Sequence, residues 1–201
     1  MGRVLVACEF SGIVRDAFRA AGHTAISVDL LPTERFGPHI MGDVTPFLRR
    51  SWDLVIAHPP CTYLANSGVR WLYVGGKGTE PDFDRVRLMF QAADFFVACL
   101  SANAPMVCVE NPVMHGHAPI RRATQYIQPW QFGHGEIKAT GLWLRGLPEL
   151  VPTNVVDGRA PRVHHASPSP DRWRERSRTL PGIAQAMADQ WGPLLPVSNR
   201  D

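Results

Sequence analysis

The chain has 201 residues, of which 45% are hydrophobic and 19% are charged, and its formal net charge at pH 7 is +3. This composition is that of a globular protein and excludes a largely disordered chain, and the small positive charge permits an anionic partner without requiring one. No apolar run reaches the roughly 20 residues needed to span a bilayer, and the start of the chain does not resemble a signal peptide. We therefore expect a cytoplasmic protein without membrane contact, whose four cysteines are reduced thiols.

The first part of the chain predicts strands that alternate with a helix. Residues 3–8 form a short apolar run typical of a buried strand, and residues 12–22 place apolar side chains at helical spacing and end at Gly22, which suits a helix C-cap. Further strands are expected over residues 24–29 and 52–58, and the second of these stops at two prolines that cannot continue strand pairing.

The second part of the chain continues the alternation. It predicts a long helix over residues 83–100 with Asp82 as its N-cap, followed by a strand over residues 105–111. A late pair of strands is expected over residues 125–132 and 140–146, and a closing helix that begins with a proline over residues 181–191. This order predicts an α/β fold with a mostly parallel sheet, helices on both faces and a late antiparallel strand pair, in a single domain over residues 1–201.

Two segments interrupt this pattern. Residues 70–82 are rich in glycine and are expected to form a mobile loop. Residues 151–177 are rich in proline and basic side chains, namely Arg159, Arg162, His164, His165, Arg172, Arg174 and Arg176. The second segment has two interpretations, a solvated irregular surface or a flap that binds phosphate.

The ends of the first two strands suggest a cofactor site, because open α/β sheets bind ligands beyond the carboxyl ends of their strands. The turn at residues 9–12 lacks the glycines that a phosphate-binding loop requires. It suits a cofactor without phosphates, with Phe10 packed on a flat ring and Gly12 allowing close approach. Asp29 is placed to bind a ribose diol and Asp43 an exocyclic amine, which favours S-adenosylmethionine over NAD. Alternatively, Phe10 belongs to the core and Asp43 caps a helix.

Cys61 is the candidate nucleophile. It lies past the end of its strand, where Pro59 and Pro60 make a rigid turn that holds Sγ at a fixed position over the cleft. Its neighbours include the polar residues Thr62, Asn66 and Ser67, whereas Cys8, Cys99 and Cys108 fall within strand or helix runs and are expected in the core. The alternative for Cys61 is a structural cysteine beside a turn.

Glu110 and Asn111 end a strand that we expect beside the Cys61 strand. The apolar run before Glu110 predicts poor solvation and a raised pKa, so that a protonated Glu110 can donate to a ring nitrogen. A salt-bridged or helix-capping glutamate is the alternative interpretation.

Together, these motifs resemble the DNA cytosine-5 methyltransferases, and most of all their short phage- or prophage-borne members. The resemblance rests on FSG (10–12), VDL (28–30), GDV (42–44), PPCTYLANSG (59–68), VENP (109–112), IKATGLWLRG (137–146) and TLPGIAQAMADQW (179–191). It implies a Rossmann-like methyltransferase domain that uses S-adenosylmethionine, needs no metal and modifies cytosine in DNA.

The resemblance also implies roles for individual residues. The catalytic residues would be Cys61, Glu110 and Asn111. Cofactor contacts would come from Glu9, Phe10, Ser11, Gly12, Asp29, Leu30, Asp43, Val44 and Pro60, and substrate contacts from Pro59, Thr62, Asn66, Ser67, Lys138 and Thr140. In the implied mechanism the Cys61 thiolate adds to carbon 6 of cytosine, Glu110 assists at ring nitrogen 3, and carbon 5 takes the methyl group.

The sequence departs from the family pattern in several places. Val14 stands where the family has a glycine, Thr62 replaces a glutamine, and Pro112 follows Glu-Asn in place of a valine. Lys138 and Arg145 are the possible substitutes for the arginines of the basic strand motif. A large target-recognition domain is lacking, and residues 151–177 alone lie where it would be inserted, which leaves a free cytosine nucleotide such as CMP or dCMP as an alternative acceptor.

Other functions stay open on the sequence alone. A non-catalytic nucleotide-binding protein would share the same sheet. A cysteine hydrolase would need a histidine base beside Cys61, for which His58, His115 and His134 are candidates. A metal site could draw on the HGH sequence at residues 115–117, but no cysteine or acid joins it at ligand spacing.

Overall fold

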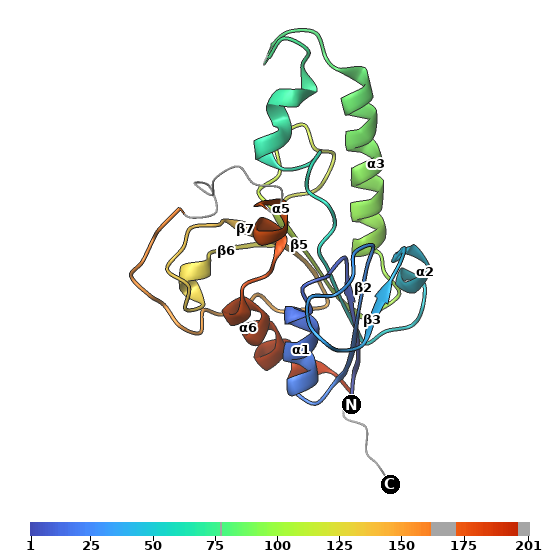
Figure 1. Ribbon diagram of the computed structural model, residues 1–201, viewed down its shortest axis with the longest axis vertical. Coiled ribbons are helices and arrows are strands. Elements are labelled where there is room, and N and C mark those ends of the chain that lie inside the picture. Colours follow the sequence, from blue (N-terminus) through green and yellow to red (C-terminus); the bar gives the residue numbers. More distant parts are fainter. Residues whose placement is uncertain (77, 162–171, 197–201) are drawn as a thin grey trace.

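The computed structural model describes residues 1–76, 78–161 and 172–196. A single sheet of seven strands runs through the molecule in the order β3-β2-β1-β4-β5-β7-β6 (Figure 1). Five strands are parallel, and β7 pairs antiparallel with both β5 and β6. The strands are β1 (Arg3–Ala7), β2 (Thr24–Asp29), β3 (His39–Met41), β4 (Leu54–Ala57), β5 (Met106–Pro112), β6 (Gln125–Ile127) and β7 (Thr140–Arg145).

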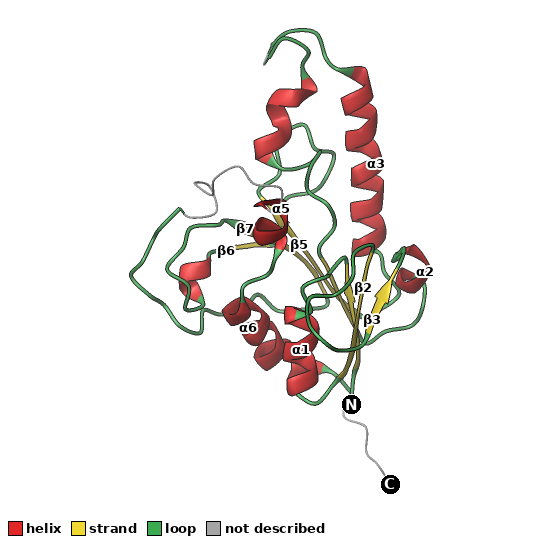
Figure 2. Cartoon of the chain, viewed as in Figure 1, coloured by secondary structure: helices red, strands yellow, loops and turns green. Residues whose placement is uncertain are grey.

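Helices cover both faces of this sheet (Figure 2). They are α1 (Ile13–Ala20), α2 (Thr45–Leu48), α3 (Phe83–Leu100), α5 (Arg172–Ser177) and α6 (Pro181–Trp191), with 3₁₀ turns η1 (Asn66–Leu72), η2 (Pro129–Gln131) and η3 (Gly192–Leu194). Helices α1 and α6 share one hydrophobic core with Val4 and Val6 of β1. Helices α2 and α3 share the other with Leu5 and Ala7, because successive strand residues face opposite sides.

Several elements of the structure have the bounds that were predicted from the sequence. Strand β2 and helices α3 and α6 coincide with their predicted ranges. Asp82 caps α3 as predicted, because its Oδ1 accepts the backbone N–H of Arg85 over 3.0 Å. Gly22 follows α1 with a φ of 88°, the left-handed conformation that a glycine C-cap adopts. The predicted α/β fold with a late antiparallel pair is therefore confirmed.

Other elements differ from the prediction for identifiable reasons. Strand β1 stops at Ala7 because Cys8 turns the chain with a φ of 57°. Strand β6 ends at Ile127, since Pro129 begins the turn η2 and lacks the N–H that a strand needs. The short strand β3 was not predicted. Of the segment expected to be a mobile loop, the start belongs to η1, and Tyr73 forms a β-bridge with Pro81.

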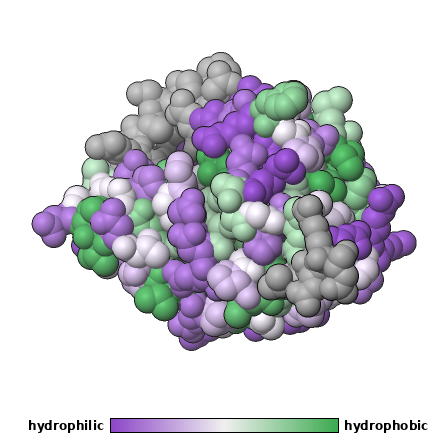
Figure 3. Space-filling view, turned by 90° about the horizontal axis from the view of Figure 1, so that it is seen from below, coloured by the Kyte–Doolittle hydropathy of each residue, from purple (hydrophilic) through white to green (hydrophobic). Residues whose placement is uncertain are grey.

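The view from below shows the amino-terminal end of the sheet, where hydrophilic and hydrophobic residues are interspersed (Figure 3). The carboxyl ends of the parallel strands point the opposite way, toward a lobe formed by η1, its following loop and the first turns of α3 (Figure 1). Among the described residues, no helix is both long and apolar enough to span a membrane.

Candidate active site

A cavity of about 270 Å³ lies at the carboxyl ends of β1, β2 and β4. It is lined by the turn after β1, the end of β2, the turn after β4 and the segment before α6, that is by Cys8, Glu9, Phe10, Ser11, Asp29, Leu31, His58, Pro60, Cys61, Thr62, Ser177 and Thr179. This is the edge at which open α/β sheets bind ligands. The folded chain thus brings Phe10, Asp29 and Cys61 to one cavity, as the sequence predicts.

The turn after β1 is held by its own residues. The buried Glu9 carboxylate accepts the backbone N–H groups of Val14 (2.6 Å) and Arg15 (3.2 Å) and the hydroxyl of Ser11 (3.2 Å), which satisfies free donors at the start of α1. Burial raises the pKa of Glu9, against the charge of His58 and these hydrogen bonds. Both carboxylate oxygens of Glu9 therefore already accept hydrogen bonds from the protein, and the residue forms part of the cavity wall.

The side chain of Arg15 leaves room only for a glycine at position 12. Its φ is 71°, and a Cβ at this position would lie 2.5 Å from the guanidinium of Arg15. The Arg15 side chain is fully buried and donates to Ser27, Thr33 and the carbonyl of Arg35, so it anchors the loop that follows β2. The glycine thus accommodates a buried arginine that braces this wall of the cavity.

The predicted cofactor carboxylates occupy different environments. Asp29 borders the cavity, its Oδ1 accepts the N–H of Leu31 over 2.9 Å, and burial raises its pKa. Asp43 is exposed and accepts both the N–H (2.9 Å) and the hydroxyl (2.8 Å) of Thr45 at the start of α2. Among the described residues that line the cavity, Gly12, Leu30, Asp43 and Val44 do not appear.

Cys61 occupies a turn fixed from two sides. Pro59 and Pro60 precede it, and its carbonyl oxygen accepts the N–H groups of Leu64 (3.0 Å) and Ala65 (2.8 Å). The side chain is half-buried and lines the cavity. Burial raises the pKa of its thiol, and the charges of Arg176 and Lys138 act in the opposite direction.

Asn111 ties this turn to the neighbouring strand. Its Nδ2 donates to the carbonyl oxygen of Pro59 over 2.7 Å, within the protein interior. Its Oδ1 is buried without a hydrogen-bond partner among the described residues. Strand β5 therefore holds the backbone that carries Cys61.

Glu110 forms a buried ion pair with His58. Glu110 Oε2 lies 3.2 Å from His58 Nδ1 and accepts the hydroxyl of Thr179 over 3.1 Å. Burial alone would raise the pKa of Glu110, but the hydrogen bond and charge of His58 outweigh it and hold that pKa below its ordinary value. Burial would lower the pKa of His58, and Glu110 raises it instead. The prediction of a raised pKa for Glu110 is wrong, because the sequence does not reveal this cationic partner.

Only some of the predicted substrate residues lie at this site. Thr62 lines the cavity, while Asn66 and Ser67 are exposed at the start of η1 in the lobe above it. Lys138 Nζ donates to the carbonyl of Arg178 over 3.3 Å, and its charge acts on His58, Glu110 and Cys61. The Thr140 hydroxyl is buried and donates to the carbonyl of Lys138.

Arg145 does not belong to this site. It ends β7 opposite Val107 near the start of β5, and its guanidinium donates to the carbonyls of Leu100 (3.2 Å), the last residue of α3, and of Ala102 (2.6 Å). Of the two proposed substitutes for the basic strand motif, the structure therefore places only Lys138 near the cavity.

The segment that joins α5 to α6 closes one side of the cavity. The Arg178 guanidinium forms two hydrogen bonds with the Glu34 carboxylate, of 2.8 and 2.6 Å, and the Glu34 N–H donates to the carbonyl of Phe10 over 2.9 Å. The guanidinium carbon of Arg174 lies 5.9 Å from the centre of the Phe10 ring. Part of the predicted basic flap thus borders the site, and its residues 162–171 lie outside the described residues.

The remaining histidine candidates have other partners. His134 Nε2 accepts the N–H of Gly182 in the first turn of α6 over 2.9 Å. His115 Nε2 lies 3.0 Å from the carbonyl of Tyr63, and His117 Nε2 lies 3.2 Å from the hydroxyl of Tyr73. Within the described residues, no three metal-ligating side chains gather in one place.

Comparison with known proteins supports the fold. No family model matches this sequence, and no curated protein sequence matches it significantly. The structure is similar to that of a protein described as a DNA modification methyltransferase encoded within a prophage of E. coli, with a TM-score of 0.50 and 12% identity, over 84% of this chain and 56% of that chain. The chain has a methyltransferase fold.

Two further structures share weaker similarity. The Dnmt2 methyltransferase of S. pombe is 13% identical over 82% of this chain and 53% of its own, with a TM-score of 0.37. The DNMT2 of Spodoptera frugiperda is 14% identical over 80% of this chain and 54% of its own, with a TM-score of 0.35. The chain therefore spans about half the length of each of these proteins.

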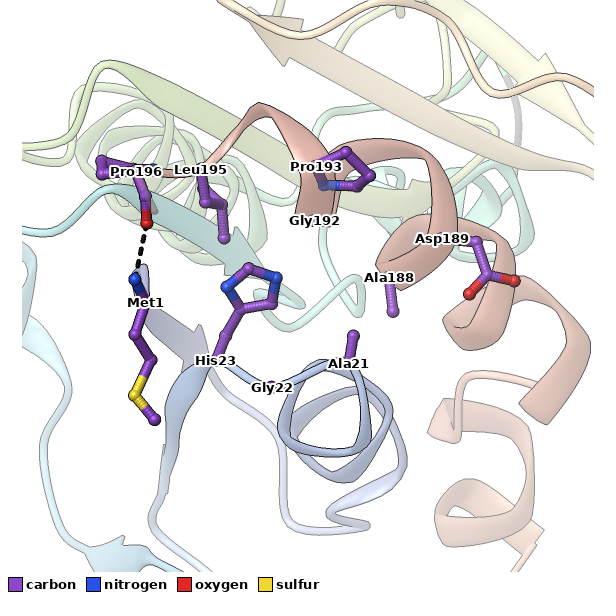
Figure 4. Close-up of a pocket in the computed structure, with 10 residues that line it drawn as sticks. All are labelled: Met1, Ala21, Gly22, His23, Ala188, Asp189, Gly192, Pro193, Leu195 and Pro196. Atoms are coloured by element: carbon purple, nitrogen blue, oxygen red, sulfur yellow. Dashed lines mark hydrogen bonds between the residues drawn. The ribbon is translucent and has the colours of Figure 1, made fainter. Parts of the chain in front are cut away.

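A larger hollow of about 550 Å³ lies at the opposite end of the sheet, between the end of α1 and η3 (Figure 4). His23 projects into it, and its Nδ1 accepts the N–H of Gly2 over 3.3 Å. The Met1 ammonium donates to the carbonyl of Pro196 along its edge. Because the parallel strands begin at this end, the hollow is remote from the carboxyl-end cavity.

Sequence reasoning missed two residues of the site. The sequence offers His58 as a candidate hydrolase base or as a polar group of a loop or pocket, and its place directly after β4 predicts a position at the ligand edge. Thr179 lies 69 positions from Glu110 along the chain. The motif at residues 179–191 predicts that this segment packs near the cofactor loop, but the contact of Thr179 with Glu110 is seen only in the three-dimensional structure.

Proposed function

We propose that this chain is an S-adenosylmethionine-dependent methyltransferase that modifies carbon 5 of cytosine in DNA. The observation that carries the proposal is the position of Cys61. A half-buried thiol on a diproline turn, tied by Asn111 to β5, borders the same cavity as Phe10 and Asp29 in a methyltransferase fold. Rigid placement favours a nucleophile, because covalent attack tolerates little positional error.

The residues around the cavity fit the cofactor. The cavity volume of about 270 Å³ lies just below the range of about 300–1,000 Å³ for small-molecule sites, so the fit rests on the residues that line it. Phe10 provides an aromatic surface and Asp29 a carboxylate at the end of β2, where a ribose diol can be bound. When bound, S-adenosylmethionine supplies an electrophilic methyl group on its sulfonium centre. The turn of residues 9–12 has one glycine and lacks the pattern of a phosphate-binding loop, which suits a cofactor without phosphates.

In the proposed reaction Cys61 activates the ring by addition. The thiol first loses its proton to solvent, because the thiolate is the nucleophile. Sγ then bonds to carbon 6, and the electron pair of the carbon 5–carbon 6 double bond moves to carbon 5, which takes the methyl group. A base next removes the hydrogen of carbon 5, the double bond re-forms, and the bond between Sγ and carbon 6 breaks to release Cys61 as a thiolate.

Glu110 has a revised role in this mechanism. The ion pair with His58 keeps it a carboxylate, so it accepts a hydrogen bond from the exocyclic amine of cytosine. Asn111 positions the Cys61 turn through the carbonyl of Pro59. Lys138 adds a positive charge that favours the anionic forms of Cys61 and Glu110.

Free cytosine nucleotide is the second candidate acceptor. Residues 146–180 are the whole connection between β7 and α6, which leaves little protein for reading bases in a duplex. The charge of Arg176 acts on Cys61, and Arg174 lies 5.9 Å from the Phe10 ring, so basic side chains of this connection lie near the cavity and would bind one phosphate as readily as a DNA backbone. With a mononucleotide, no base would need to be extruded from a stack.

The test is methyl transfer from labelled cofactor to duplex DNA, single-stranded DNA, CMP and dCMP in parallel, with digestion of the product to identify 5-methylcytosine. Acceptors that carry 5-fluorocytosine trap the covalent adduct, since fluorine at carbon 5 cannot leave as a proton does. Peptide mapping locates the adduct at Cys61 or at Cys8, the other cysteine that lines the cavity. Transfer to no cytosine acceptor, or an adduct on Cys8, would overturn the proposal.

A further inference from the structure

Two buried polar atoms without partners lie at the ends of neighbouring strands. His58 Nε2 follows β4, Asn111 Oδ1 belongs to β5, and neither has a hydrogen-bond partner among the described residues. Leaving such a group unsatisfied costs about 1–3 kcal/mol. The His58 ring itself is about one-tenth exposed and lines the cavity that contains Cys61. An unpaired ring nitrogen at this place indicates a partner that arrives with the ligand.

The protonation state of His58 determines whether Nε2 is a hydrogen-bond donor or an acceptor. Its Nδ1 faces Glu110 Oε2 at 3.2 Å, and the charged groups that act on it are Glu110 on β5, Glu9 after β1 and Lys138 before β7. The two carboxylates favour the imidazolium and Lys138 opposes it, and the pKa of His58 is raised. As an imidazolium, His58 donates from both nitrogens. Its Nε2 is therefore an unused hydrogen-bond donor.

Glu110 provides the complementary group. His58 and Thr179 both bind its Oε2, and no described residue donates to Oε1. The ion pair thus combines one available acceptor, Glu110 Oε1, with one available donor, His58 Nε2. Cytosine carries an amine donor beside the acceptor atoms N3 and O2, whereas uracil and thymine carry an acceptor at position 4 and an N–H at position 3.

We propose that His58 reads the pyrimidine, with Nε2–H donating to N3 of cytosine while Glu110 accepts from its amine. This inference rests on the proposed function and assigns the selection of cytosine over uracil to the ion pair. A site with buried polar groups rejects a ligand that leaves them unpaired or opposed. His58 is then a specificity-determining residue of the cavity.

The binding test uses protein labelled with ¹⁵N at its eight histidines. The probes are single-stranded oligonucleotides that differ in one cytosine or uracil, together with dCMP and dUMP. The His58→Gln variant assigns the His58 resonances. We expect the cytosine probes to shift Nε2 and the uracil probes to leave it unchanged. No shift with either base, or equal shifts with both, would overturn the inference, whether or not the protein transfers methyl groups.

The kinetic test compares His58→Gln, which keeps an N–H donor without a titrating ring, with His58→Ala, which has none. We expect at least a 100-fold loss of kcat/KM on cytosine for the alanine variant and a smaller loss for the glutamine variant. His23→Gln at the remote hollow is the matched control, and thermal unfolding checks the fold of each variant. If wild type methylates cytosine and both His58 variants equal it, the role of His58 is rejected while the proposed function stands.

Discussion

The side-chain amide of Asn111 donates to the carbonyl oxygen of Pro59 over 2.7 Å and thereby fastens the turn of Cys61 to the centre of the sheet. Neighbouring parallel strands β4 and β5 bring these two residues together from 52 positions apart in sequence. The position of the Cys61 turn after β4 therefore depends on the residue at the end of β5.

Asn111→Ala should reduce catalysis far more than stability. Loss of the hydrogen bond costs about 1 kcal/mol of unfolding free energy, whereas a displacement of about 1 Å at the nucleophile costs about 100-fold in rate. The measurement is kcat for methyl transfer together with denaturant unfolding. Asn103→Ala is the control, because Asn103 Nδ2 also donates to a backbone carbonyl, that of Arg49, but in a loop at the opposite end of the sheet. Equal kcat losses in both variants would contradict this prediction.

Glu110→Gln should alter the pH dependence of stability. His58, with a pKa raised above 6.5, contributes stability that is full below 6.5 and is lost as pH rises through the raised pKa. Glu110, with a pKa held below 4.5, contributes stability that is present above 4.5 and is lost as pH falls through the lowered pKa. The pair therefore stabilises most between these two ordinary values.

Thermal unfolding across pH tests this expectation. Breaking a buried ion pair costs about 3–5 kcal/mol, so the difference in Tm between wild type and Glu110→Gln should be largest near pH 5.5 and shrink toward pH 9. Glu34→Gln removes a charge from a partly exposed pair, for which at most about 1 kcal/mol is expected. A difference that is constant with pH would show that the pair does not titrate as described.

The rate of methyl transfer should follow two opposed ionisations. Attack needs the Cys61 thiolate, whose pKa burial raises, and in our further inference binding needs the His58 imidazolium. The wild-type kcat/KM should rise with pH up to the pKa of His58, level off, and fall above the pKa of Cys61. In His58→Gln the rate should continue to rise through the level region, because only the thiolate then titrates. An unchanged profile would separate His58 from the reaction.

Gly12→Ala should destabilise the protein through two separable effects. A positive φ costs a residue with a Cβ about 1–2 kcal/mol, and this Cβ would also lie 2.5 Å from the buried Arg15 guanidinium. Gly22→Ala isolates the first effect, because Gly22 has a φ of 88° and nothing lies within 4 Å of its Cβ position. Denaturant unfolding should show the larger loss at Gly12, and equal losses would refute the steric effect of Arg15.

Asp29→Asn should weaken binding of S-adenosylmethionine about tenfold, since an amide is a poorer acceptor for a ribose diol than a carboxylate. Isothermal titration calorimetry measures the change. Asp53→Asn provides the control, because the Asp53 carboxylate also accepts a backbone N–H, from Arg3 at the opposite end of the sheet. Unchanged affinity in Asp29→Asn would remove Asp29 from the cofactor site.

The sequence predicts the architecture well where local signals agree. Helix α3 combines an N-cap at Asp82 with long helical periodicity, and α6 combines a first-turn proline with an apolar face, so both were predicted with correct bounds. Strand β3 has three residues and weak local preference, and its pairing with β2 is what makes it a strand. Its existence depends on tertiary structure that no local pattern encodes.

The candidate site was predictable in position but not in electrostatics. The rule that ligands bind at carboxyl strand ends correctly brings Phe10, Asp29 and Cys61 to one cavity. The same reasoning gave Glu110 the wrong direction of pKa shift, because its burial was visible in the sequence and its ion pair with His58 was not. Gly12 likewise was assigned to ligand approach, whereas a buried arginine explains it.

The paired hydrogen bonds between Arg178 and Glu34 have a kinetic consequence. They clamp together segments 144 positions apart in sequence, beside the ring of Phe10, so a molecule that enters or leaves past this edge must wait until they separate. In the proposed function, release of the spent cofactor past this edge would include the opening of this pair. Mobile ions weaken such a partly exposed charge pair, so moderate salt should make this edge of the cavity open more often.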